Sequence, residues 1–121
     1  MTKQEVTALL IQWFEKLKTN VPKEVTALYA TDAVLLPTIS NMVRHNHNEI
    51  EDYFVQFLAN KPSGKLLEQN IRVFNDIAMN SGIYEIKFND GSCVAARFSF
   101  VYQLQDDNWK IIEHHSSRMP E

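Results

Sequence analysis

The hydrophobic periodicity of this chain changes once, near Lys65. Before that point, apolar residues recur every three or four positions, which is typical of helices that bury one face. From Lys65 onward the period is two, which is typical of strands. A chain with helices first and strands second is predicted to be an α+β protein, in which the helices cover one face of a strongly curved antiparallel sheet.

The predicted helical half begins at Thr2, whose spacing to Glu5 fits a capping box. This first helix buries a stripe of residues: Val6, Leu9, Leu10, Trp13, Phe14 and Leu17. A shorter helix follows Pro22, with Val25, Leu28 and Tyr29 on one side.

A short apolar run, Ala33 to Leu36, is stopped by Pro37, which predicts either a strand at a sheet edge or a lining segment. A third amphipathic helix is predicted after Asn48, which with Glu51 has the spacing of an N-cap. Pro62-Ser63-Gly64 ends this helix.

Four strands are predicted in the second half, at roughly 66–79, 83–88, 92–103 and 109–116. The turn-forming segments between them are Asn80-Ser81-Gly82, Asn89-Asp90-Gly91 and Asp106-Asp107-Asn108. These residue types tolerate positive φ, so the segments are typical of hairpins. The second half is therefore predicted to be an antiparallel meander.

Composition excludes several classes of protein. With 121 residues, 45% of them hydrophobic, we expect one domain over 1–121. The 12 basic and 15 acidic residues are spread along the chain, which argues against a nucleic-acid partner. No apolar run approaches the ~20 residues of a membrane span, and the N-terminal residues lack the order of a signal peptide. Together with a single cysteine, Cys93, this predicts a cytoplasmic protein.

Arg97 is the most informative candidate for a binding residue. It stands within an apolar run, Cys93 to Tyr102, so its guanidinium is predicted to be partly buried and to face a ligand anion or Glu113. A two-residue turn at Asp90-Gly91 would place Arg97 opposite Tyr84.

His114 and His115 are the next candidates. Neighbours on a strand point to opposite faces, so at most one of the two faces a pocket, and the pair cannot chelate one metal ion. A three-residue loop before the last strand brings His115 opposite Arg97, whereas a two-residue loop brings His114 there. The sequence leaves this choice open.

Other polar residues carry weaker signals. Tyr29 and Tyr53 lie on core stripes and could present their hydroxyls to a cavity. His45 and His47 have the spacing of a weak metal motif, although an exposed loop is the commoner explanation. The sequence thus indicates neither a metal site nor a cofactor.

The strand that carries Phe98, Phe100 and Tyr102 alternates these residues with Arg97, Ser99 and Val101. Both of its faces are predicted to be substantially apolar. Because the helices cover only one face, the other is expected to be covered by a second subunit, which predicts at least a homodimer.

Three segments carry a resemblance to a known family: VLLPTISN (Val34 to Asn41), AARFSFVY (Ala95 to Tyr102) and WKIIEHHSSRMPE (Trp109 to Glu121). With the order of helices and strands, they resemble the nuclear transport factor 2-like superfamily. Within it, the chain is most similar to SnoaL-like and SgcJ/EcaC proteins and to the association (hub) domain of calcium/calmodulin-dependent protein kinase II. The resemblance covers nearly the whole chain and implies a cone-shaped fold with a pocket at its open end, usually paired through the outer sheet face.

Two functional hypotheses follow. The first is a non-catalytic oligomerisation module that binds a small polar or anionic molecule near Arg97 and one of the two terminal histidines. The second is a small-molecule isomerase or cyclase, in which His114 or His115 carries the proton and a tyrosine orients the substrate. The sequence does not decide whether the protein is an enzyme.

Overall fold

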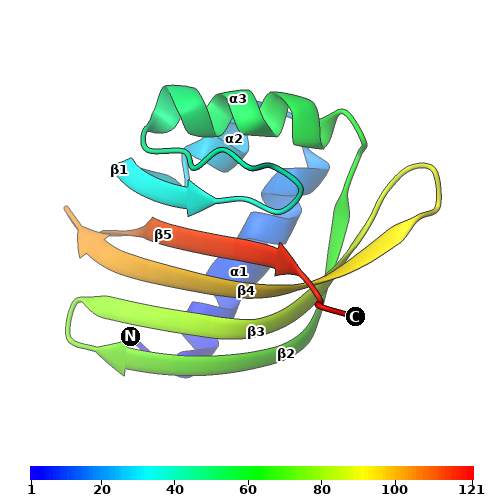
Figure 1. The fold of residues 1–121 in the computed structure, drawn as a ribbon. Helices are drawn as coiled ribbons and strands as arrows, with labels where there is room; N and C mark the ends of the chain where they lie inside the picture. The colour runs from blue at the N-terminus through cyan, green and yellow to red at the C-terminus, as the bar shows by residue number, and fades with distance from the viewer.

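A computed structural model describes residues 1–121 and confirms the α+β architecture (Figure 1). The helices are α1 (Lys3–Lys18), α2 (Pro22–Thr26) and α3 (His47–Leu58). The strands are β1 (Tyr29–Leu36), β2 (Ser63–Phe74), β3 (Ile77–Lys87), β4 (Cys93–Gln105) and β5 (Asn108–Arg118).

The strands form one curved sheet in the order β1-β5-β4-β3-β2. Strands β2 to β5 are the predicted antiparallel meander, and β1 pairs with β5 in parallel at the edge. Figure 1 shows α1 crossing one face of the sheet and α3 lying over the end formed by β1. The space between these helices and the sheet holds a single cluster of 23 buried apolar residues.

The first helix is as predicted. Thr2 accepts a hydrogen bond from the backbone N–H of Glu5, and the Glu5 carboxylate accepts one from the backbone N–H of Thr2. Val6, Leu10, Trp13, Phe14 and Leu17 are buried.

The second and third helices differ from prediction at their ends. Tyr29 lies in β1 rather than in α2, because the chain pairs with β5 from that point, Tyr29 opposite Ile111. The N-cap of α3 is Asn46, not Asn48: its side chain accepts from the backbone N–H of Glu49 at 2.9 Å. Asn46 and Asn48 are both suitable N-cap residues, and the position of the loop before α3 in the fold selects Asn46.

One predicted turn was wrong. The β2–β3 hairpin turns at Asn75 and Asp76, whereas Asn80-Ser81-Gly82 lies in the middle of β3. Asn80 is fully buried there, and its amide donates to the Gln69 side chain at 3.1 Å. In the sequence, a buried asparagine that has a hydrogen-bond partner cannot be distinguished from an asparagine that forms a turn.

Gly82 explains why a glycine stands inside a strand. Leu67 is an extra residue between the pairs Leu66–Tyr84 and Glu68–Ile83, so β2 bulges beside Gly82. A Cβ on Gly82 would lie 2.0 Å from the carbonyl oxygen of Glu68. Bulges increase the local bend and twist of a sheet, so this close approach helps to curve the sheet around its contents.

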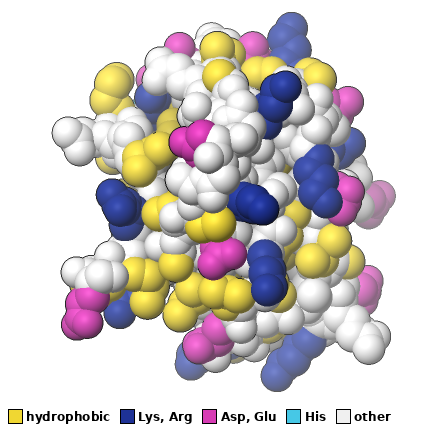
Figure 2. Space-filling view, turned by 90° about the vertical axis from the view of Figure 1, so that its right-hand side faces the viewer, with side chains coloured by type: hydrophobic (Ala, Val, Ile, Leu, Met, Phe, Trp, Pro, Cys, Tyr) yellow, Lys and Arg dark blue, Asp and Glu magenta, His cyan; other side chains and the backbone are white.

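One end of the molecule shows no large field of one charge (Figure 2). Figure 2 views the end at which the C terminus and the β3–β4 hairpin lie, where basic and acidic side chains alternate and hydrophobic ones form small groups. None of the helices combines the length and the apolar character of a membrane span.

We predict that Gly82→Ala lowers the free energy of unfolding by about 1–3 kcal/mol, because the new methyl group meets backbone atoms that cannot move without breaking the β2–β3 pairing. Urea unfolding followed by tryptophan fluorescence measures this. Ser81→Ala, at the exposed neighbouring position, should stay within about 0.5 kcal/mol of wild type. Equal stability of the two variants would contradict the role given to Gly82.

Candidate functional site

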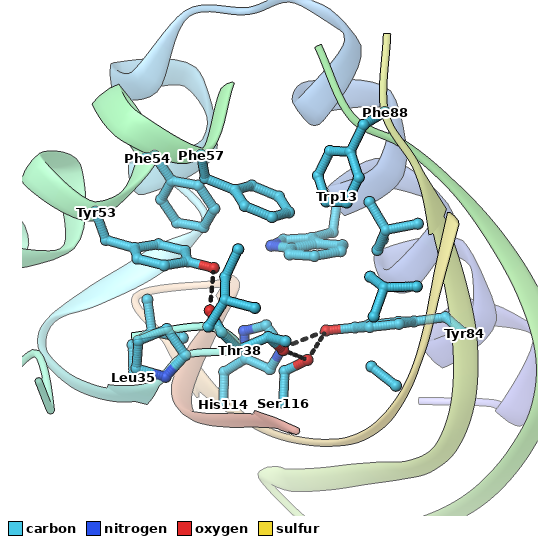
Figure 3. Close-up of a pocket in the computed structure, with 15 residues that line it drawn as sticks. Trp13, Leu35, Thr38, Tyr53, Phe54, Phe57, Tyr84, Phe88, His114 and Ser116 are labelled. Atoms are coloured by element: carbon cyan, nitrogen blue, oxygen red, sulfur yellow. Dashed lines mark hydrogen bonds between the residues drawn. The ribbon is translucent and has the colours of Figure 1, made fainter. Parts of the chain in front are cut away.

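A pocket lies between helices α1 and α3 and the inner face of the sheet (Figure 3). Its cavity volume is about 20 Å³, which is room for about one water molecule. Its walls are mainly apolar and aromatic, and no Lys, Arg, Asp or Glu lines it. The lining residues are Trp13, Leu35, Pro37, Thr38, Ile39, Tyr53, Phe54, Phe57, Tyr84, Ile86, Phe88, Val94, Ala96, His114 and Ser116.

The aromatic walls come from three elements. Trp13 of α1 stacks on Tyr84 of β3, with ring centroids 5.6 Å apart. Tyr53 and Phe57, one turn apart on α3, stack on each other at 5.5 Å. Phe88, at the start of the β3–β4 loop, packs edge-on against Phe57. Flat surfaces therefore bound the pocket on several sides.

The polar groups gather at the inner end of the pocket, around His114. This residue lies on β5 and is 2% exposed, and its ring stacks on Phe100 at 3.9 Å. Its Nδ1 lies 2.8 Å from the Tyr29 hydroxyl, and its Nε2 lies 3.2 Å from the Tyr84 hydroxyl. Both ring nitrogens therefore have partners within the protein.

The hydrogen bonds continue beyond His114 on both sides. Trp13 donates from Nε1 to the Tyr29 hydroxyl at 3.1 Å. Tyr84 donates to Ser116 Oγ at 2.7 Å, and Thr38 Oγ1 donates to the same oxygen. We call these six residues, Trp13, Tyr29, His114, Tyr84, Ser116 and Thr38, the polar chain; Figure 3 shows its end at the pocket.

The titratable members of the polar chain are held neutral. Burial lowers the pKa of His114 from 6.5 to about 3, and the neighbouring charge of His115 contributes in the same direction. Burial also raises the pKa of the Tyr29 and Tyr84 hydroxyls well above 10. At neutral pH the inner end of the pocket carries no charge.

Four of the six predicted site residues meet here. Tyr84, Tyr53 and His114 line the pocket, and Tyr29 lies behind His114 and holds its Nδ1. Tyr53 donates from its hydroxyl to the backbone oxygen of Thr38 at 3.1 Å. The question between the two histidines is thereby answered: His114 faces the pocket.

Arg97 and His115 do not belong to the pocket, and the burial predicted for Arg97 was wrong. Both side chains are exposed, on the outer face of the sheet. Arg97 pairs with Ile83 and Ser117, and it is Ala96 that lies opposite Tyr84. The expected Arg97–Glu113 ion pair and the expected cation for an anionic ligand are therefore absent from the site.

The reason is the strand register. The β3–β4 connection is not a two-residue turn: residues 88–92 form the loop, with Phe88 N–H donating to the Ser92 carbonyl. A shift of one residue in pairing moves each side chain to the other face. On β5 a second irregularity, with Ile112 as the extra residue between the pairs Tyr102–Ile111 and Val101–Glu113, brings His114 opposite Phe100.

The buried cation of this protein is Arg44, which lies in the segment before α3. It is 5% exposed and donates from Nη1 to Asp52 at 2.8 Å and to the backbone oxygen of Glu49. Its guanidinium lies 5.8 Å from the ring centroid of Tyr53. Arg44 thus supports the α3 wall rather than facing the cavity.

The two histidines of the loop before α3 have separate partners. His45 contacts the Glu49 carboxylate at 3.0 Å, and His47 Nε2 contacts the backbone oxygen of Tyr29 at 2.7 Å. The two histidines that suggested a weak metal motif instead make contacts that hold the start of α3 in place.

Sequence reasoning missed Trp13, Thr38 and Ser116 as members of the site. Ser116 carried a usable signal, because it is two residues from His114 and therefore shares its face of the strand. Trp13 fits an ordinary core stripe, and nothing local distinguishes its indole N–H. Thr38 follows Pro37 in a loop, where the sequence does not predict which way a side chain points.

The curved sheet and the covering helices form a fold of the nuclear transport factor 2-like type. A model of the calcium/calmodulin-dependent protein kinase II association domain matches residues 2–120. The chain belongs to this family.

Solved structures share this fold. A Xanthomonas campestris protein, described as a candidate association domain of that kinase, is 44% identical, with a TM-score of 0.96 over 100% of this chain and 90% of the other. An NTF2-like protein of unknown function from Pseudomonas putida is 18% identical (TM-score 0.84; 95% and 84% covered). An NTF2-like protein with a cystatin-like fold from Novosphingobium aromaticivorans is 9% identical (TM-score 0.81; 98% and 82% covered). No curated protein sequence matches the chain.

We predict that His114 makes stability depend on pH. Between pH 6.5 and about 3 the unfolded chain binds a proton at His114 that the folded protein does not, so the free energy of unfolding falls as the pH drops through this range. A full difference of one proton gives a slope of about 1.4 kcal/mol per pH unit. The folded-state ring of His114 should remain neutral to pH 4.5 in NMR spectra of labelled histidine. Titration of His114 near 6.5 would contradict its burial.

Proposed function

We propose that this protein is a non-catalytic module that forms homo-oligomers and holds a small molecule in its pocket. The supporting observation is the polar chain: its histidine and tyrosines are neutral and are engaged with one another. Membership of the association-domain family supports the assembly part of the proposal.

The polar chain argues against the alternative function, an isomerase or cyclase in which a histidine carries the proton. General acid–base catalysis needs a positioned group whose pKa lies near the working pH. His114 has a pKa of about 3, its two nitrogens are occupied, and no carboxylate lines the pocket. A bound molecule would meet no group ready to take up or release a proton.

Assembly is expected through the outer face of the sheet, because both α1 and α3 lie on the inner side. Met79 of β3 and Val101 of β4 are paired neighbours on this face, and Met79 is 41% exposed. Arg97 and Ser99 lie beside them, so the face is mixed rather than fully apolar. Interfaces of non-obligate complexes have this composition.

Cys93 is a free thiol, which fits the reducing cytoplasm.

We predict that the protein is at least a dimer, with about twice the 14.0 kDa mass of one chain, and that Met79→Glu dissociates it by placing a carboxylate in the interface. Light scattering after size-exclusion chromatography measures the mass. Val55→Glu is the matched control, since Val55 is 55% exposed on α3, which lies on the inner side of the sheet. A monomeric wild type would refute the assembly, and an unchanged mass for Met79→Glu would exclude this face.

We also predict that Val94→Phe closes the pocket. Val94 is half-buried on the pocket wall near Phe88, so a larger ring there should block entry while the core stays intact. Saturation-transfer NMR with a library of small compounds should give hits with wild type and with the matched variant Val55→Phe, whose position is exposed on α3, but not with Val94→Phe. Each bound compound should be recovered unchanged after long incubation. Chemical conversion of a hit, abolished by Val94→Phe, would instead establish an enzyme.

A further inference from the structure

We propose that residues 37–43, in the loop between β1 and α3, are a gate that opens to admit a small molecule to the buried cavity. We call this segment the gate. This inference rests on the proposed function, since it supplies the entry and the space that a bound molecule needs. With the gate closed, the cavity has room for about one water molecule, so binding requires that a wall of the cavity move.

The gate is the wall between two hollows. On its inner side lies the cavity of about 20 Å³. On its outer side, between the gate and the end of β5, lies an open groove of about 310 Å³. Pro37, Thr38, Ile39 and Ser116 line both hollows. Displacement of the first three residues would therefore join the cavity to the groove, and the joined volume reaches the range of small-molecule pockets, about 300–1,000 Å³.

The base of the gate is fixed. Leu35 and Arg44, on either side of it, exchange two backbone hydrogen bonds of 2.9 Å. The Arg44 side chain donates to Asp52 and to the backbone oxygen of Glu49, so this end of the loop is held against α3. Movement is therefore confined to the residues between Leu35 and Arg44, as in compact loops whose two ends lie close together.

The gate itself is held by few contacts. None of its backbone groups takes part in a hydrogen bond to another backbone group. Two hydrogen bonds join it to the rest of the protein, and both are at Thr38 (Figure 3). Tyr53 donates to the Thr38 backbone oxygen at 3.1 Å, and the Thr38 hydroxyl donates to Ser116. A segment with so few buried contacts opens at a lower free energy than the protein unfolds.

The backbone of Ile39 is strained in the closed gate. Its φ is 58°, in the left-handed region, which β-branched residues rarely adopt because of steric clashes. The Ile39 side chain is 63% exposed, so apolar burial does little to offset this strain, and Met42 and Val43 are also exposed. Backbone strain of this kind occurs at ligand clamps and switch regions. Opening of the gate would release the strain.

Thiol labelling measures opening of the gate without a ligand. In a Cys93→Ser background, which removes the exposed native thiol, Ala96→Cys places a thiol on the cavity wall, and Ala78→Cys places one in the core outside the cavity. Ala96 and Ala78 are 1% and 0% exposed, so the two positions are matched in burial. Opening of the gate exposes only position 96, whereas global unfolding exposes both positions. We expect iodoacetamide to label Ala96→Cys about ten-fold faster than Ala78→Cys, and faster than its own global unfolding in urea predicts.

Further substitutions test what holds the gate closed. Tyr53→Phe removes the hydrogen bond to the Thr38 backbone and should speed the labelling of Ala96→Cys about five-fold. Tyr102→Phe is the matched control, because the Tyr102 hydroxyl is buried without a hydrogen-bond partner, and it should leave this rate unchanged. Ile39→Asn should slow the labelling, since asparagine tolerates positive φ and relieves the strain of the closed gate.

The outcomes separate the two proposals. Equal labelling of positions 96 and 78 would overturn the gate, as would a rate at position 96 that Tyr53→Phe does not raise or that Ile39→Asn does not lower. If the gate opens as described but no compound of the library protects position 96 from iodoacetamide, the gate stands and the proposed ligand binding fails. If compounds bind in the NMR experiment while position 96 is labelled only on global unfolding, the gate fails and ligand binding stands.

Discussion

The burial of a neutral imidazole is the interaction on which the rest of the site depends. His114 is enclosed by Trp13, Tyr29, Tyr84 and Phe100, where a charge would have neither water nor a counter-ion. A buried polar group is tolerated only if its hydrogen-bonding atoms are matched, and here each nitrogen has one hydroxyl partner. The same bonds tie α1, β1, β3 and β5 together at one point, so the polar chain both fixes the core and sets the chemistry of the pocket.

The pocket exists because the sheet bends away from the helices. The extra residues Leu67 and Ile112 bend β2 and β5, and Gly82 permits the close approach of backbone beside the first of them. Helix α3, braced by the Arg44–Asp52 pair, then covers the hollow with Tyr53 and aromatic neighbours. A flat sheet of the same composition would pack directly against α1 and leave no cavity.

The residue types of the site do not by themselves define its chemistry. Tyrosine, histidine and serine side chains near a cavity are often taken as signs of acid–base chemistry. Here these side chains are hydrogen-bonded to one another, and the pKa of the His114 imidazole lies far below neutrality. The polar groups at the inner end of the pocket are therefore neutral and hydrogen-bonded to one another.

Local signals in the sequence determined much of this protein. The capping box at Thr2, the apolar stripe of α1, the meander and the edge position of β1 could all be predicted, because caps and periodicity depend on neighbours within a few residues. Tyr84, Tyr53, Tyr29 and the His114/His115 pair were also identified as candidates. The tertiary structure decided which way these side chains point. A five-residue loop and a bulge set the register that turns His114 inward and Arg97 outward, and no local pattern specifies either feature. The contact between Tyr29 and His114, 85 positions apart in the chain, arises only when β1 pairs with β5, and this pairing gives the buried imidazole its partner.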